Sequence, residues 1–141
     1  MVNCSRENFL APEIRDGTPV SKELKEVWKV LLDILEEIMR ICEKYNLRWT
    51  LEGGSLLGAV RHHGIIPWDD DIDVVMPRKD YDKLARILPK ELPAYYEMQT
   101  SGETKDFYIP HIMVRDSRTT GIDPFHAKNK WCFNMGIRID I

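Results

Sequence analysis

The stretch GGSLLGAVRHHGIIPWDDDIDVVMPR, residues 53 to 78, decides how the rest of this 141-residue sequence is interpreted. It begins with two glycines and a serine, which suit a tight turn, and continues with a helical pattern that Gly64 ends. We therefore predict a helix over 55 to 63. The β-rich run from Ile72 to Met76 predicts a strand, and the aspartates that lead into it are Asp69, Asp70, Asp71 and Asp73.

Two further helices are expected on either side of this stretch. Ser21 is a good N-cap, apolar residues follow it at helical spacing, and Asn46 suits the end of a helix, so we predict a long helix over 21 to 45. The second helix should run from Pro77 to about Leu88, because the prolines at 89 and 93 interrupt its pattern.

The remaining elements are short strands. β-rich runs predict strands over 48 to 51, 95 to 100, 108 to 114 and 136 to 141, with a polar loop over 116 to 130. Residues 1 to 20 contain Pro12, Gly17 and Pro19 and are expected to be irregular. The length and the hydrophobic content of 43% fit one globular domain, which we assign to residues 21 to 141.

The overall composition excludes several classes of protein. A net charge of -3 and a pI near 5.8 argue against nucleic acid as a partner. Cys4, Cys42 and Cys132 are odd in number and form no CxxC pattern, so they predict reduced thiols rather than a disulfide framework or a zinc site. With no apolar signal sequence and no run long enough to span a membrane, we expect a soluble, cytoplasmic protein.

The aspartates have the arrangement of a metal site. On a strand, Asp71 and Asp73 would point to the same face while Ile72 enters the core. Paired carboxylates suit Mg²⁺ or Mn²⁺, which bind oxygen ligands together with substrate phosphates. Gly54 and Ser55, at the start of a helix, would receive such a phosphate. Asp140, in the late strand GIRIDI, offers a third carboxylate, and three on neighbouring strands would hold two metals.

Simpler readings of these residues remain open. A run of aspartates is most often a solvated acidic loop, whereas an EF-hand is poorly matched, since Val74 stands where its glycine is expected. Asp69 can instead cap or brace the turn. The other open assignments are helix-dipole or phosphate contacts for His62 and His63, packing or a choline-binding face for Trp68, and a surface turn or a diphosphate contact for Arg115 and Arg118.

Gly54-Ser55, Asp71-x-Asp73 and the later Asp140 resemble the signature of the nucleotidyltransferase superfamily. The segments EIRDGTPVS, GGSLLGAVRHHGIIPWDDDIDVVMPRKDYDKL and GIRIDI are similar to the LicD family, over residue 11 to the C-terminus. The resemblance implies an α+β, nucleotidyltransferase-like (polymerase-beta-like) mixed sheet flanked by helices. Family members usually continue past the last strand, so we expect a domain that is incomplete at its C-terminus and a substrate pocket that is only partly built.

The resemblance also implies a reaction. LicD-type enzymes transfer a phospho-alcohol, phosphocholine or ribitol phosphate, from a CDP-alcohol such as CDP-choline to a glycan or lipid-linked glycan and release CMP. Asp71 and Asp73 would hold both Mg²⁺ or Mn²⁺ ions and Asp140 one of them, with Asp140 also serving as the general base. Arg61 and Arg78 would steady the diphosphate. Such an acceptor implies transient contact with the inner face of the membrane.

Two alternatives differ in chemistry from this reaction. A nucleotidyltransferase proper would act on a nucleoside triphosphate and release pyrophosphate. A non-catalytic nucleotide-binding remnant would bind nucleotide with metal and form no product.

Overall fold

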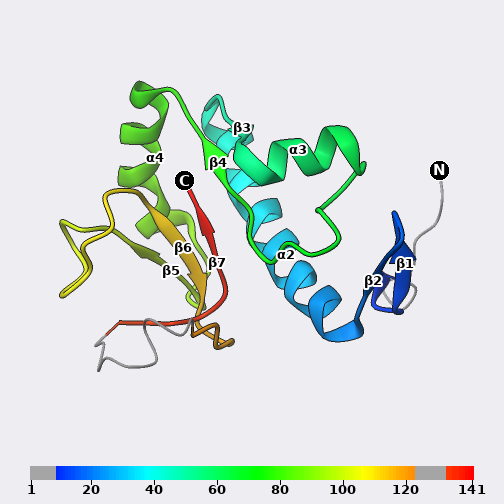
Figure 1. Ribbon diagram of the computed structural model, residues 1–141. Coiled ribbons are helices and arrows are strands. Elements are labelled where there is room, and N and C mark those ends of the chain that lie inside the picture. The colour runs from blue at the N-terminus through cyan, green and yellow to red at the C-terminus, as the bar shows by residue number, and fades with distance from the viewer. Residues whose placement is uncertain (1–8, 123–132) are drawn as a thin grey trace.

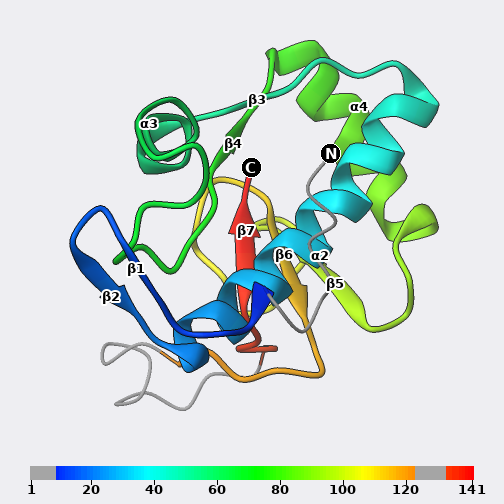
Figure 2. The ribbon, with the colours of Figure 1, turned by 90° about the vertical axis from the view of Figure 1, so that its right-hand side faces the viewer.

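The computed structural model describes residues 9 to 122 and 133 to 141. Within them the chain forms three helices and seven short strands, an α+β arrangement (Figures 1 and 2). In chain order these are β1 (Glu13–Arg15), β2 (Thr18–Val20), α2 (Lys22–Tyr45), β3 (Thr50–Leu51), α3 (Gly53–Arg61), β4 (Val74–Val75), α4 (Arg78–Glu91), β5 (Tyr96–Gln99), β6 (Met113–Asp116) and β7 (Arg138–Asp140).

Helix α2 is the central support of the fold, and the sequence predicted both of its ends. The Ser21 side chain accepts a hydrogen bond from the Leu24 amide at 3.2 Å, and Asn46 ends the helix in the left-handed conformation, φ 51°. One face buries a stripe that includes Trp28, Leu31 and Ile34. This stripe packs against β6 and β7, so α2 covers one face of the sheet that carries Asp140 (Figure 2).

The strands form three small sheets instead of one continuous sheet. β1 pairs with β2, β3 pairs with β4, and the third sheet has the order β5-β6-β7, all antiparallel. A single parallel bridge between Asp73 and Asp140 joins the β3-β4 pair to the edge of the third sheet at β7. In both ribbon views the end of β7 lies beside β4 (Figures 1 and 2). The α+β class that the sequence predicted is confirmed, whereas the expected mixed sheet is replaced by three antiparallel sheets and one parallel bridge.

The prediction of an irregular segment over 1 to 20 is wrong for residues 13 to 20, while residues 1 to 8 lie outside the described part. β1 and β2 form a hairpin through Asp16 and Gly17, whose φ values of 49° and 78° are those of a two-residue turn. The buried Lys25 of α2 pairs with Glu13 at 3.0 Å and anchors this hairpin. An Asp-Gly pair between short β-rich runs is the sequence signal that predicts such a turn.

Several predicted boundaries also moved. Helix α4 continues through Pro89 to Glu91, whose carboxylate lies 2.8 Å from Lys44 Nζ of α2. The strand expected over 108 to 114 is displaced to β6. The other expected strands are present in shortened form. The part of the polar loop over 123 to 130 lies outside the described residues.

The buried core lies between α2, α4 and the sheets, and includes Trp28, Ile38, Leu84, Val114 and Ile139. Cys42 is a free, buried thiol whose pKa is raised to about 11 by burial; Cys4 and Cys132 lie outside the described residues. Among the helices within residues 9 to 122 and 133 to 141, none combines the length and apolarity needed to cross a membrane.

Candidate functional site

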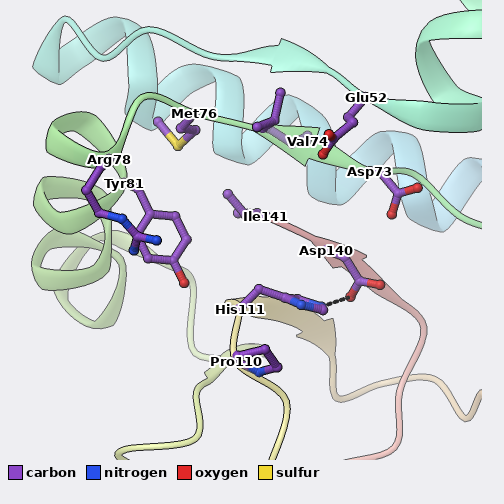
Figure 3. Close-up of a pocket in the computed structure, with 11 residues that line it drawn as sticks. Glu52, Asp73, Val74, Met76, Arg78, Tyr81, Pro110, His111, Asp140 and Ile141 are labelled. Atoms are coloured by element: carbon purple, nitrogen blue, oxygen red, sulfur yellow. Dashed lines mark ion pairs between the residues drawn. The ribbon is translucent and has the colours of Figure 1, made fainter.

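A cleft of about 410 Å³ opens where β4, α4 and β7 meet (Figure 3). It receives side chains from both sides of the Asp73–Asp140 bridge and from the loop before β6. The lining residues are Glu52, Asp73, Val74, Val75, Met76, Arg78, Tyr81, Pro110, His111, Asp140 and Ile141. The cleft therefore joins segments that are far apart in the sequence.

Asp73 and Asp140 face this cleft because the backbone fixes both of them. The parallel bridge pairs the two residues, and the Asp140 amide donates to the Ile72 carbonyl at 3.3 Å. Ile72 and Ile139 are buried behind them, which leaves each carboxylate on the open side. Asp140 Oδ1 also accepts from Arg138 Nε at 3.2 Å and lies 3.7 Å from His111 Nε2.

The electrostatics of Asp73 reflect crowding by like charges. Partial burial raises the pKa of its carboxyl group above the ordinary value, and Asp71, Asp140 and Glu52 raise it further, while His111 acts in the opposite direction. Carboxylates that repel one another in this way gain from a cation placed between them. The negative charge is therefore concentrated at one end of the cleft.

Gly53 and Gly54, predicted as a turn before a helix over 55 to 63, are the first residues of α3, and this glycine turn of the helix supports the aspartates directly. Ser55 Oγ accepts a hydrogen bond from the Asp73 amide at 2.9 Å, so the serine fixes the backbone that carries Asp73. A Cβ atom on Gly54 would lie 2.9 Å from an Asp69 carboxylate oxygen, and one on Gly53, where φ is +52°, would lie 3.6 Å from an Asp73 oxygen. The turn thus leaves space for two carboxylates of this chain.

Asp71 does not line this cleft. Residues 71 to 73 precede β4, so the alternation of side chains along a strand does not apply to them. Asp71 lines a second cavity of about 270 Å³ together with Asp69 and Ser55, over a largely apolar floor. Burial and the neighbouring Asp71 raise the pKa of Asp69. Asp69 also accepts a hydrogen bond from Trp28 Nε1 through its carbonyl at 2.7 Å, which agrees with the bracing role considered for it.

The side chains of the cleft fit a divalent cation in their chemistry. Mg²⁺ typically binds through one or two carboxylates and takes its other ligands from phosphates and water. Asp73 and Asp140 meet that requirement. Within the described residues, however, no group of three His, Cys, Asp or Glu side chains is arranged to hold an ion. Of the three carboxylates expected to form the metal site, Asp73 and Asp140 line the cleft. Asp71 lines the second cavity instead.

The other predicted residues divide between the cleft and the surface. Arg78 lines the cleft, whereas Arg61 lies at the end of α3, where its Nε donates to His62 Nε2 at 2.8 Å. His62 is held by Asp16 of the hairpin and contacts the Trp68 ring edge-on at 5.9 Å. Trp68 is 63% exposed, so the packing role that the sequence favoured is limited to this contact.

Arg115 and Arg118 both pair with other groups of this protein. Arg115 is buried and donates to Gln99 Oε1 at 2.7 Å and to the Gly136 carbonyl at 2.8 Å. Arg118 pairs with Asp116 at 2.7 Å and lies over the Tyr95 ring at 3.8 Å. Both arginines stabilise the sheet that carries Asp140.

Sequence reasoning missed three residues of the cleft: Glu52, Tyr81 and His111. Glu52 directly precedes the glycine turn, and its position there was the one available signal. Tyr81 lies one helical turn after Pro77, and His111 follows a proline, with no pattern around either of them. Their proximity to Asp73 and Asp140 depends on contacts between distant segments.

Comparison with known proteins connects this geometry to a family. Residues 46 to 135 match the family described as LicD/FKTN/FKRP, nucleotidyltransferase domain. The chain is 44% identical over 97 residues to the lipopolysaccharide cholinephosphotransferase LicD of Haemophilus influenzae, covering 68% of this chain and 37% of that protein. It is 46% identical over 110 residues to the human ribitol 5-phosphate transferase FKRP, covering 72% of this chain and 21% of that protein.

The chain thus spans well under half the length of each of these relatives. The matched region contains the glycines at the start of α3, the four aspartates from Asp69 to Asp73 and the whole of α4, but it ends before Asp140. Because the family match covers most of the chain, and because the relatives are more than 40% identical over about two thirds of it or more, this protein belongs to the LicD family.

Proposed function

We propose that this chain contributes to the metal-dependent transfer of a phospho-alcohol, phosphocholine in the first instance, from a CDP-alcohol to a glycan hydroxyl. The observation that carries the proposal is the pair of carboxylates, Asp73 and Asp140, fixed by one backbone bridge at the end of an open cleft. Membership of the LicD family and the activities that its relatives are named for support the reaction class.

In the proposed reaction, the acceptor oxygen forms a bond to the distal phosphorus of the donor. The bond between that phosphorus and the bridging oxygen breaks, and CMP leaves with the bridging oxygen. Asp140 takes up the proton of the acceptor hydroxyl. A divalent cation, Mg²⁺ or Mn²⁺, would supply charge neutralisation on the phosphoryl oxygens.

The roles of the individual residues follow from their positions. Asp73 and Asp140 would hold the cation, and the backbone amides at the start of α3 would attract the phosphate. Ser55 acts through the backbone of Asp73. Asp71 adds negative charge next to Asp73, since it raises the pKa of the Asp73 carboxyl group.

The proposed acceptor is a precursor of a cell-surface glycan or glycolipid. One relative is named a lipopolysaccharide cholinephosphotransferase and the other a ribitol 5-phosphate transferase, and the first of these names supports a glycan acceptor. A nucleotidyltransferase-like fold, a cytoplasmic location and transient contact with the inner face of the membrane are parts of the same proposal.

The test is the release of CMP from CDP-choline and from CDP-ribitol, each with a glycan acceptor and Mg²⁺ or Mn²⁺, followed by addition of EDTA. We expect CMP from at least one donor, loss of release with EDTA, and loss in Asp73→Asn but not in the exposed control Asp106→Asn. Release of pyrophosphate from CTP in place of CMP would indicate a nucleotidyltransferase. Metal-dependent nucleotide binding without any product would contradict transfer by this chain.

A further inference from the structure

The end of the cleft opposite the carboxylates has a different chemistry. Arg78 and Tyr81, both from the first turns of α4, lie together there, and the guanidinium carbon is 4.9 Å from the centre of the Tyr81 ring (Figure 3). Met76, Pro110 and Ile141 complete an apolar surround. This half therefore presents a flat cation on an aromatic support and no carboxylate from the cleft lining.

Arg78 contacts two neighbouring side chains, Tyr81 and Asp82. The Arg78 guanidinium carbon lies over the Tyr81 ring at 4.9 Å, and 80% of the Arg78 side chain is exposed, so the guanidinium remains open to a ligand. Asp82, one turn along α4, lies 3.7 Å from Arg78 Nη1 and offsets part of its charge. A guanidinium is planar and stacks on aromatic rings, so Arg78 beside the Tyr81 ring can receive a flat ligand group.

The cleft as a whole is therefore bipolar. Glu52, Asp73 and Asp140 at one end require a ligand group that arrives with cations, as phosphates do. The Arg78–Tyr81 end requires a flat, weakly polar group. A nucleotide combines both within one molecule, with its phosphates and its base at opposite ends.

We propose that the Arg78–Tyr81 end is the nucleobase subsite, in which the base stacks on the Arg78 guanidinium and Tyr81 is a positioning residue beside it. The inference rests on the proposed function, since it locates the base of the donor for that reaction. It replaces the diphosphate contact that the sequence suggested for Arg78, and the two roles predict different results for the same variants.

The experiment compares CMP with ribose 5-phosphate, which carries a phosphate and no base, as probes of the full chain in the presence of Mg²⁺. Ligand-observed NMR measures both, because it extends to weak binding. Arg78→Lys keeps the charge and removes the planar group, so CMP binding should weaken by about tenfold while ribose 5-phosphate binding is unchanged. Arg86→Lys, on the exposed side of the same helix and outside the cleft, is the matched control.

Tyr81 provides the second test. Tyr81→Phe keeps the ring and should bind CMP as the unaltered chain does, whereas Tyr81→Leu should lose most of the preference for CMP over ribose 5-phosphate. Because Tyr81 also packs against the core, the unfolding midpoint of each variant is measured, and the ratio of the two affinities is the readout.

Three results would overturn the inference: equal binding of CMP and ribose 5-phosphate by the unaltered chain, equal losses for both probes in Arg78→Lys, or no loss for either. Each is distinct from failure of the proposed function, which is judged by CMP release with an acceptor. A chain that binds the base but transfers no phospho-alcohol would contradict the proposed function and leave the nucleobase subsite standing.

Discussion

Asp73 and Asp140 lie side by side because a single parallel β-bridge pairs their backbones, with the Asp140 amide 3.3 Å from the Ile72 carbonyl. Neither carboxylate takes part in that pairing. Both side chains are therefore available to a ligand, and either one can be replaced without removing the contact that joins the two sheets. Because the backbone holds the sheets together and the side chains face the cleft, a substitution of either aspartate tests the role of its carboxylate.

Replacing Asp73 should separate stability from activity. Asp73→Asn removes a charge that Asp71, Asp140 and Glu52 repel, so thermal unfolding should occur at the same temperature or higher. Activity in the CMP-release assay should fall by more than about a hundredfold, since a ligand of the cation is lost. Unchanged turnover in Asp73→Asn would remove Asp73 from the proposed site.

Ser55→Ala should destabilise the protein in the absence of any ligand. The substitution leaves the Asp73 amide without its 2.9 Å acceptor in a partly buried position, at a cost of about 1 kcal/mol. Chemical denaturation measures the difference. If stability is unchanged while nucleotide affinity falls, the hydroxyl serves the phosphate, as the sequence suggested, and not the backbone.

The glycines of α3 should differ in their tolerance of a side chain. A Cβ on Gly58 would lie 2.6 Å from the Gly64 carbonyl oxygen and 3.1 Å from the Ile66 amide nitrogen, neither of which is free to rotate away. Gly58→Ala should therefore cost about 1 to 3 kcal/mol. In Gly54→Ala the close atom is the end of the Asp69 side chain, which can turn, so the free energy of unfolding should change little.

Urea unfolding of the two alanine variants decides this prediction. Equal losses at both positions would mean that the Asp69 carboxylate is as firmly held as backbone. A Gly58→Ala variant as stable as the unaltered chain would contradict the close packing of α3 on the loop that follows it.

The pairing of Glu13 with Lys25 should make the hairpin's contribution to stability depend on pH. The contact with the buried Lys25 ammonium group lowers the pKa of the Glu13 carboxyl group most strongly, burial offsets part of this effect, and Arg15 lowers the pKa further. A lowered pKa in the folded state stabilises the protein above the unfolded value of about 4.3, and the benefit is lost as pH falls through the folded value.

The measurement is the difference in unfolding free energy between the unaltered chain and Glu13→Gln across a pH series. The difference should be constant near neutral pH and shrink as the pH falls below about 4.3. Glu26→Gln, whose partner Lys22 is 3.7 Å away on the exposed face of α2, should show little difference throughout. A difference independent of pH would rule out the ion pair as its source.

Local patterns in the sequence predicted the helices well. The ends of α2 were given by Ser21 and Asn46, because capping depends on residues within one turn of each other. The hairpin at Asp16 was missed although its signal is equally local, since the prolines and the glycine around it were taken as irregular structure. The extension of α4 past Pro89 had no local signal, and its last residue, Glu91, pairs with Lys44 of α2.

The candidate site divides in the same way. The sequence by itself determined the family, the glycine turn and the presence of Asp73 and Asp140, since these are properties of contiguous segments. Only the tertiary structure decided that Asp140 lies next to Asp73, that Asp71 faces the other cavity, and that Glu52, His111 and Tyr81 line the cleft. The physical reason is that side-chain direction near a strand end is set by pairing with a distant strand, and the sequence of either strand alone does not contain that pairing.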